Sequence, residues 1–477
     1  MKKYKRTHPY SILIRLRISA VLLLLPILQQ ILYQPQNTLE IISSLGYNAF
    51  YALAVILYAI YSYQSYSYKI VDGGISIRDG LIFQKHFTIP YNKILTVTFS
   101  NELIPSALFG ATKVSFDTPG GLGSKYDVTA YFSKKRTQQI LDKIRAETPE
   151  QECIRADFVN TILMCAFWSN PASGFLIIAP LISSSGNVLG KELTEVIIGQ
   201  TMDFRIEILA RWLSPVAGAV ASLLLLGWGI SMLAVFLRYA RFRVFTQGDY
   251  IGIARGLVNK HVMYTQRCGL TAVSIDQSLL MKILGLYTAS IFTIGSGKLK
   301  GDKSLIVAPS KKKKLYQALF LIADISYRET RSVYANPRSI MSYLYLPLTV
   351  SAIIITVIAT ADYFIFINNV FKTLLVFSLF LLLWWILFRI WSHRKSHIGF
   401  NDRFFVVSGF SKLTQKKYYI PFRKIQRITL TQSIPQRIAG NCTVKVYLYF
   451  EKRACHTVRH LPKKEAEQLL RAMKQYR

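Results

Sequence analysis

Two short motifs in this sequence could in principle do chemistry, and the first is a glycine-rich segment. The segment "IGSGKLKGDKS", residues 294–304, invites comparison with a phosphate-binding loop, which needs four residues between two glycines and then Lys-Ser or Lys-Thr. Counted back from Lys298, the first glycine position holds Phe292, and Leu299 follows the lysine. The motif therefore fails, and we predict a glycine-rich loop between two strands.

The second motif is a pair of histidines, His393 and His397, which would share a face if both lay on one helix. A metal site needs acidic or further imidazole ligands, whereas Arg394 and Lys395 lie between these two side chains. We therefore expect solvated histidines, no metal and no cofactor. No nucleophile, base and orienting group can be assembled from the sequence, so we do not predict an enzyme.

Clusters of basic residues are the remaining candidates for a functional site. A basic residue close to an anionic leaflet gains about 1 kcal/mol, so we expect these clusters to contact lipid headgroups or a partner. The candidate residues are Lys298, Lys300, Lys303, Lys311, Lys312, Lys313, Lys314, Lys416, Lys417, Arg423, Lys424 and Arg427. A general excess of positive charge on the cytoplasmic side would explain them without a ligand. The net charge of +34 is not accompanied by a nucleic-acid recognition motif, so nucleic acid is not predicted as a partner.

Blocks of apolar residues must position these clusters. Of the 477 residues 51% are hydrophobic and only 18% are charged, and the apolar residues occur in long runs. A helix needs about 20 apolar residues to cross a bilayer. We predict six spans, at residues 16–33, 47–63, 158–183, 212–237, 340–360 and 373–391. A cleaved signal peptide is the alternative for the first, but no small-residue cleavage site follows it.

The distribution of charge predicts the topology. The three connections 34–46, 184–211 and 361–372 hold four basic and six acidic residues, out of 59 and 25 in the whole chain. Because Lys and Arg accumulate on the cytoplasmic side, both termini and all long polar segments are predicted to be cytoplasmic. The five cysteines contain no C-x-x-C pair, which fits a reducing compartment.

A unit of two spans followed by about 80 polar residues occurs three times. The predicted segments are hairpins at 1–66, 148–240 and 327–398 and β domains at 67–147, 241–326 and 399–477. Alternation of apolar and polar residues around Ile75 and Ile77, and around Val444 and Val446, predicts half-buried strands. Apolar residues at helical spacing predict a closing helix in each domain, at residues 133–146, 311–324 and 463–474.

The polar segments share short phrases. "IPYNKI" at 89–94 and "IPFRKI" at 420–425 follow glycine-ended strands at Gly80 and Gly409, and Gly256 ends the corresponding strand of the second repeat. Pro90 and Pro421 are expected at the first residue of a strand, where no ladder hydrogen bond is lost. The first repeat continues with "ELIPSALFGATKVSFDTPGG" and the second with "SLLMKILGLYTASIFTIGSG".

On these phrases the chain resembles the bacterial pleckstrin-homology-like domain of multi-pass membrane proteins of the YdbT and YdbS type. The second repeat departs by having Gln266 at the proline position, and the third has "IPQRIAGN" in place of the leucine-glycine phrase. The resemblance implies an integral membrane protein of the bacterial cell membrane. Three transmembrane helical hairpins would alternate with three cytoplasmic PH-like β-barrel or sandwich domains, each closed by a C-terminal helix.

The predicted function is a non-enzymatic scaffold whose β domains dock on the inner leaflet or on partner proteins. The resemblance implies a smaller relative with one such domain as partner in a hetero-complex. A role in tolerance of envelope stress, such as membrane-active peptides, would suit this design. The alternative is a transporter or exporter of a small or amphipathic molecule. Such a transporter would need polar residues facing inward across several spans, and Asn160 and Asn170 are the candidates.

Overall fold

The computed structural model describes residues 4–16, 38–71, 73–80, 83–119, 128–144, 149–169, 215–293, 304–325, 329–365, 370–411, 414–448 and 455–474, and all structural statements refer to these residues. The chain forms two compact units, which are described separately. The first comprises Met1–Glu152, Phe245–Gly269 and Thr293–Asp302; the second comprises Cys153–Val244, Leu270–Phe292 and Lys303–Arg477.

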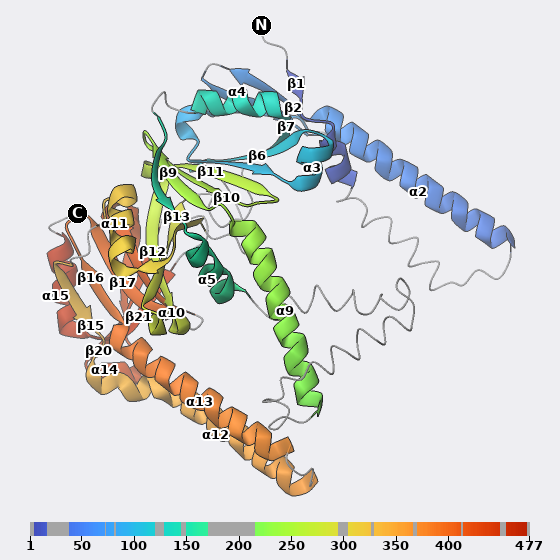
Figure 1. Ribbon diagram of the computed structural model, residues 1–477. Coiled ribbons are helices and arrows are strands. Elements are labelled where there is room, and N and C mark those ends of the chain that lie inside the picture. Colours follow the sequence, from blue (N-terminus) through green and yellow to red (C-terminus); the bar gives the residue numbers. More distant parts are fainter. Residues whose placement is uncertain are drawn as a thin grey trace. The chain divides into compact units, whose positions relative to one another are not determined.

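The first unit holds most of the first repeat and two strands of the second (Figure 1). Its elements are β1 (Lys5–Arg6), α2 (Thr38–Ser65), β2 (Ser67–Val71), β3 (Gly74–Asp79), β4 (Lys85–Pro90), η1 (Tyr91–Lys93), β5 (Thr96–Asn101), α3 (Leu103–Leu108), β6 (Ala111–Asp117), β7 (Val128–Ser133), α4 (Lys134–Ile144), β10 (Tyr250–Arg255), β11 (Lys260–Gln266) and η2 (Arg267–Gly269). Two of the boundaries between the units fall within β8 (Gln151–Arg155) and β9 (Arg243–Gln247).

The second unit holds the rest of the second repeat and the whole of the third. Its elements are α5 (Phe158–Trp168), α9 (Pro215–Tyr239), β12 (Leu270–Ser278), α10 (Leu279–Ile283), β13 (Leu286–Thr293), β14 (Ser304–Lys311), α11 (Lys312–Ala323), β15 (Arg331–Tyr334), η3 (Pro337–Ser339), α12 (Ile340–Ile365), α13 (Val370–Lys395), β16 (His397–Phe400), β17 (Phe404–Ser411), β18 (Thr414–Pro421), η4 (Phe422–Lys424), β19 (Ile425–Thr431), α14 (Ile434–Ile438), β20 (Asn441–Leu448), β21 (Cys455–Pro462) and α15 (Lys463–Lys474).

The sheets are shared between successive repeats. The strand orders are β1-β2-β3-β4, β7-β6-β5-β11-β10-β9-β8, β14-β13-β12-β18-β17-β16-β15 and β19-β20-β21. The pairing of β5 with β11 joins the second half of the first repeat to the first half of the second, and β12 with β18 joins the second repeat to the third. This sharing was not predicted from the sequence.

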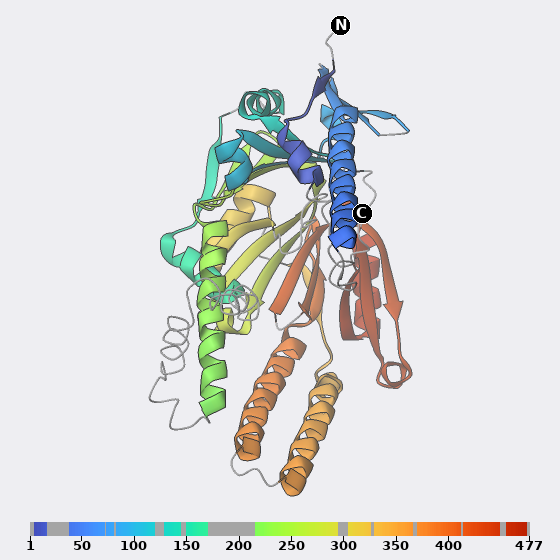
Figure 2. The same cartoon turned by 90° about the vertical axis from the view of Figure 1, so that its right-hand side faces the viewer.

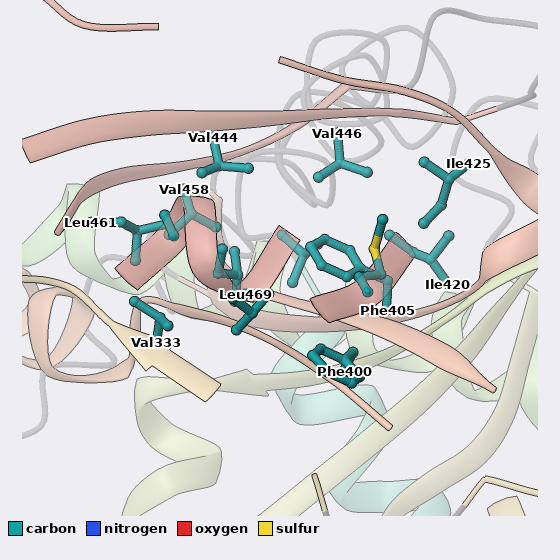
Figure 3. Packing of buried hydrophobic residues seen from close by; sticks show 14 of the residues in the cluster. Val333, Phe400, Phe405, Ile420, Ile425, Val444, Val446, Val458, Leu461 and Leu469 are labelled. Carbon is teal, nitrogen blue, oxygen red and sulfur yellow. The ribbon is translucent and has the colours of Figure 1, made fainter. Parts of the chain in front are cut away.

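Each predicted alternation places one face of a strand in a hydrophobic core. Ile75 and Ile77 of β3 are buried in the core of the first unit together with Ile140 of α4. In the third repeat, Val444 and Val446 of β20 point toward the same core as Phe405 of β17 (Figure 3). The predicted closing helices are confirmed as α4, α11 and α15, with ends within two residues of prediction.

The predicted spans are only partly represented among the described residues. One helix there, Pro337–Thr360, is long and apolar enough to cross a bilayer, and Ala52–Ser65, Phe158–Trp168 and Leu225–Tyr239 are shorter apolar helices. Helices α12 and α13 lie side by side in both views (Figures 1 and 2). The three predicted transmembrane hairpins are therefore unconfirmed, and residues 17–37 and 170–214 lie outside the described part of the chain.

Helix α2 begins at Thr38, nine residues before the predicted start of the second span. The predicted connection 34–46 therefore overlaps the start of this helix.

Two predictions about the repeated phrases were wrong. Pro90 and Pro421 are the last residues of β4 and β18, and each is the N-cap residue of a single 3-10 turn, η1 or η4. The φ angle of a proline is fixed by its ring, and it suits this position. Gly409 lies inside β17 rather than at its end. Gly80 and Gly256 do follow their strands, and both have positive φ, 126° and 100°.

Candidate functional site

The same pair of elements recurs in all three repeats. The first of the two is a short helix (α3, α10 or α14) that follows β5, β12 or β19. A glycine with φ near 65° ends each of these helices: Gly110, Gly285 and Gly440. Such a left-handed glycine is the usual C-terminal cap of a helix. The phrase "IPQRIAGN" therefore does in the third repeat what the leucine-glycine phrase does in the others.

The residue after each of these glycines pairs with the last residue of the closing strand. The pairs are Ala111 with Ser133, Leu286 with Lys311, and Asn441 with Pro462. In the third repeat the Lys463 N–H also donates to the Gly440 carbonyl, at 3.0 Å. The first turn of the closing helix therefore lies beside the short helix in every repeat. We call each such pair of elements a corner.

The short helices expose apolar side chains. Leu108 of α3 is 73% exposed, Ile283 of α10 is 71% exposed and Ile438 of α14 is 85% exposed. The other strongly exposed apolar residues of the three helices and their caps are Leu103, Phe109, Leu280, Leu284 and Ile434. One residue of each helix faces inward instead: Pro105, Met281 and Gln436 are buried.

The first turn of each closing helix supplies the basic half of the corner. In the second repeat Lys311, Lys312, Lys313 and Lys314 are all exposed. The other exposed residues at this position are Lys134 and Lys135 in the first repeat and Lys463 and Lys464 in the third. Each corner therefore combines two or more exposed apolar side chains with two or more lysines.

The first corner contacts residues 8 and 10, and the third corner contacts the residue just before η3 and α12. The N–H of His8 donates to the Tyr131 carbonyl at 2.8 Å, and the Tyr10 ring lies 5.2 Å from that of Phe109. In the third repeat the N–H of Asn336 donates to the His460 carbonyl at 2.9 Å. Both acceptors are two residues before the end of their strand, so the same connection occurs in both repeats.

The second corner contacts the last turns of α13. The Nζ atom of Lys282 lies 4.4 Å from the ring centre of Trp391. Burial and the nearby charges of Lys395 and Arg394 lower the pKa of Lys282. The rings of Trp391 and Phe410 are 5.0 Å apart, so the end of α13 and the β17–β18 hairpin carry an aromatic cluster beside this corner.

The predicted basic residues separate into four groups. Lys311–Lys314 lie in the second corner, whereas residues 298, 300 and 303 are outside the described part of the chain. Arg423 and Lys424 follow Pro421, which pairs with Phe404 at the end of β17 away from Phe410. Arg427 stacks on Tyr447, 4.7 Å from its ring centre. These last three residues are therefore not part of a corner.

Lys416 and Lys417 lie on β18, and Lys417 is used inside the protein. Its ammonium forms an ion pair with Glu329, and the Nε2 atom of His397 lies 3.4 Å from the same carboxylate. Although burial raises the pKa of Glu329, the hydrogen bond from His397 and the charge of Lys417 together lower it to about 2. Lys417 is therefore not available to a headgroup.

The expectation of solvated histidines was wrong. His393 and His397 are each only 5% exposed, and they lie on α13 and β16 rather than on one helix face. The Nε2 atom of His393 lies 3.0 Å from the Asn336 carbonyl oxygen, to which its N–H donates. Both histidines thus hold the junction between the apolar helices and the β domain, because their neighbours on the folded chain supply better partners than water.

Sequence reasoning missed the apolar half of the corners. The signal was available: an isolated pair of large apolar residues between two turn signals, as in "LFG" and "ILG", has no strand or long helix to bury it. From the sequence these phrases serve only as evidence of repetition. The lysines at the start of the second closing helix are among the candidate residues, but the apolar side chains beside them are not.

Comparison with known proteins gives three matches to one family. The model of the family described as Bacterial PH domain matches residues 13–148, 199–319 and 344–477. The UPF0699 transmembrane protein YdbT of Bacillus subtilis (strain 168) is 23% identical over 350 residues, which cover 66% of this chain and 68% of that protein. No solved structure matches.

Proposed function

Because this chain belongs to the bacterial PH domain family, we propose that it is a membrane-anchored, non-enzymatic scaffold whose three corners rest on the inner leaflet. The observation that carries the proposal is the threefold recurrence of exposed apolar residues beside lysines. The second corner also lies next to α13, and the third next to the residue that precedes η3 and α12. The name of the Bacillus subtilis relative, a transmembrane protein, supports a membrane location. The six-span topology with cytoplasmic termini is part of the proposal.

The composition of the corners suits the boundary between headgroups and acyl chains. An interfacial helix buries its apolar side chains below the headgroups and keeps its basic residues among them. Full burial of one Leu or Ile is worth about 1.5–3 kcal/mol, and each lysine near an anionic leaflet adds about 1 kcal/mol. The second corner, with Leu280, Ile283, Leu284 and Lys311–Lys314, therefore has the largest expected attraction.

Spin labels on the intact protein in nanodiscs with anionic lipid would test the depth of this corner. A label at Ile283→Cys is expected to be more accessible to oxygen than to a water-soluble nickel chelate. Leu321 of α11 is also exposed but lies outside the corner, so a label at Leu321→Cys serves as the matched control and should show the opposite accessibility. Equal aqueous accessibility at both positions would contradict docking.

The electrostatic part of the proposal has a separate test. Neutralising Lys311–Lys314 to Gln is expected to move the label at position 283 toward water in anionic nanodiscs, and high salt should act in the same direction because it screens exposed charges. In zwitterionic nanodiscs the four substitutions should have little effect. The same shift in both lipids would indicate a local change of fold instead.

The cytoplasmic location of the domains is tested by reporter fusions. A reporter that is active only in the cytoplasm should be active when fused after residue 140 or after residue 320. Activity of a periplasmic or extracellular reporter at either position would overturn the proposed topology and, with it, the contact with the inner leaflet.

The cellular role that we propose for the scaffold concerns stress on the cell envelope. A role in tolerance of membrane-active peptides, together with a smaller relative that has one such domain, is the cellular form of the proposal. Deletion of the gene should raise sensitivity to such peptides, and the variant with Ile283, Leu284 and Leu280 changed to Ser should not restore tolerance. If that variant restored peptide tolerance, the stress role would not depend on the exposed apolar residues of the second corner.

A further inference from the structure

The two smaller sheets correspond in strand composition to the two parts of each larger sheet. In both seven-stranded sheets, three strands from the second half of one repeat join four strands from the first half of the next. The second half of the third repeat forms only the three-stranded sheet β19-β20-β21, and the first half of the first repeat forms only the four-stranded sheet β1-β2-β3-β4. Together they have the composition of a third seven-stranded sheet.

The register of the two complete junctions is the same. The repeats can be aligned on two reference positions. The first is the N-cap residue of the short helix, which is Glu102, Ser278 or Ser433. The second is the last residue of the partner strand, which is Gln266, Pro421 or Pro90, and with this alignment the residue pairs of the two junctions are equivalent. Ser100 pairs with His261 as Asp276 pairs with Lys416, and Thr98 pairs with Met263 as Ser274 pairs with Tyr418. The same strand register therefore occurs at both junctions between repeats, and it predicts how β19 and β4 would pair.

The strands at those two edges are exposed where their equivalents are buried. In β5, Val97 and Phe99 are buried against their neighbours; the equivalent residues of β19, Ile428 and Leu430, are not, and Leu430 is 38% exposed. In β11, Met263 is buried, whereas the equivalent Phe87 of β4 is 40% exposed. Among the described residues, no strand pairs with the outer edge of β4 or of β19.

We propose that β19 of one copy of this chain pairs with β4 of a second copy, and so completes a third seven-stranded sheet between chains. An edge strand presents unpaired N–H and C=O groups, and strand addition satisfies them. A second copy is the occupant because this chain itself carries both complementary edges. The contact is head-to-tail, so it closes into a ring or continues as a filament. The proposal goes beyond docking on lipid and does not rest on it.

The transferred register gives compatible neighbours. Its pairs are Gln432 with Gln84, Thr431 with Lys85, Leu430 with His86, Thr429 with Phe87, Ile428 with Thr88 and Arg427 with Ile89. No two like charges face each other, which would disfavour the sheet. Because each copy has its own apolar helices, neighbouring copies can occupy one membrane.

Cysteine cross-linking of two differently tagged full-length chains in their membranes tests both the contact and the register. One chain carries Phe87→Cys and the other Thr429→Cys, which the register places opposite each other, in a background with the exposed Cys268 changed to Ser. Oxidation is expected to give a band containing both tags, at twice 54.4 kDa. Thr88→Cys with Thr429→Cys is the matched control, since these side chains lie on opposite faces, and it should not cross-link.

Each alternative occupant gives a different result. A single chain carrying both Phe87→Cys and Thr429→Cys should give a ladder of oligomers; if it gives only an internally cross-linked monomer, the chain closes on itself and the proposal is wrong. Cross-linking of Thr429→Cys to a smaller protein instead, or no cross-link at the predicted pair, would also overturn it. None of these outcomes depends on whether the corners touch lipid, so the proposed function can fail separately.

Discussion

Burial and neighbouring charges move the pKa of several ionisable groups of the β domains far from the ordinary value, and His456 is one of them. His456 of β21 stacks on Tyr418, with ring centres 3.7 Å apart. Burial, with a smaller contribution from the charge of Lys416, lowers the pKa of His456 to about 4. The folded protein therefore keeps this imidazole neutral at pH values where the unfolded chain would bind a proton.

The expected consequence is a loss of stability on acidification. Between pH 6.5 and about 4 the unfolded state takes up a proton at His456 and the folded state does not, so the free energy of unfolding falls by about 1.4 kcal/mol per pH unit in that window. Thermal unfolding in detergent from pH 7 to pH 4 would measure it. The His456→Phe variant keeps a ring against Tyr418 and should lose this part of the slope; parallel profiles would contradict the assignment. Glu329, whose pKa is lowered to about 2, adds to this slope only below about pH 5.5, where the unfolded chain begins to bind a proton at this carboxyl and the folded chain does not.

Glycines that look alike in the sequence have different roles. A Cβ at Gly256 would overlap the Asn259 carbonyl oxygen, and its φ of 100° disfavours any other residue, whereas a Cβ at Gly409 has nothing closer than the Thr457 carbonyl oxygen at 3.5 Å. Gly256→Ala is expected to lower stability by about 1–3 kcal/mol and Gly409→Ala by less than about 1 kcal/mol. Denaturation of the two variants in parallel is the measurement, and equal losses would be evidence against the turn argument.

Individual elements were the most predictable part of the molecule. The burial of Ile75, Ile77, Val444 and Val446 and the three closing helices follow from periodicity, because an apolar stripe needs only its own strand or helix to be recognised. The positions of Pro90 and Pro421 were not predictable in this way, since the start and the end of a strand tolerate proline equally. The corners could not be predicted from periodicity, because they depend on which short helix lies beside which closing helix. That arrangement follows from the register of the paired strands.

Between elements, the ion pair of Glu329 with Lys417 joins the segment before β15 to β18. A Cβ at Gly399 would lie 2.6 Å from the Glu329 carboxylate, so the glycine leaves room for it. Lys417→Met should lower stability by about 3–5 kcal/mol, because the mostly buried carboxylate loses its counter-ion. Glu329→Gln combined with Lys417→Met should recover part of that loss. A double variant less stable than Lys417→Met alone, in the same denaturation experiment, would contradict this account.

At the scale of the whole molecule, shared sheets make the repeats interdependent. The pairing of β5 with β11 predicts that residues 1–147 and 148–477, co-expressed as separate chains, remain together during purification. A single charged substitution at the buried junction, Val97→Asp, should separate them, whereas Leu108→Asp on the exposed surface should not. Fragments that separate without any substitution would show that the junction contributes little. Sequence periodicity predicts each repeat but carries no information about pairing between repeats.

The order of synthesis gives the shared sheets a further consequence. Strand β5 ends at Asn101 and its partner β11 ends at Gln266, about 165 residues later. At about 5–20 residues per second the ribosome needs roughly 8–33 seconds to make that stretch. During this interval every nascent chain has a strand waiting for a neighbour that has not yet been translated, and a second chain emerging nearby could occupy the edge first. Slow or crowded translation should therefore favour chains joined through the wrong repeat.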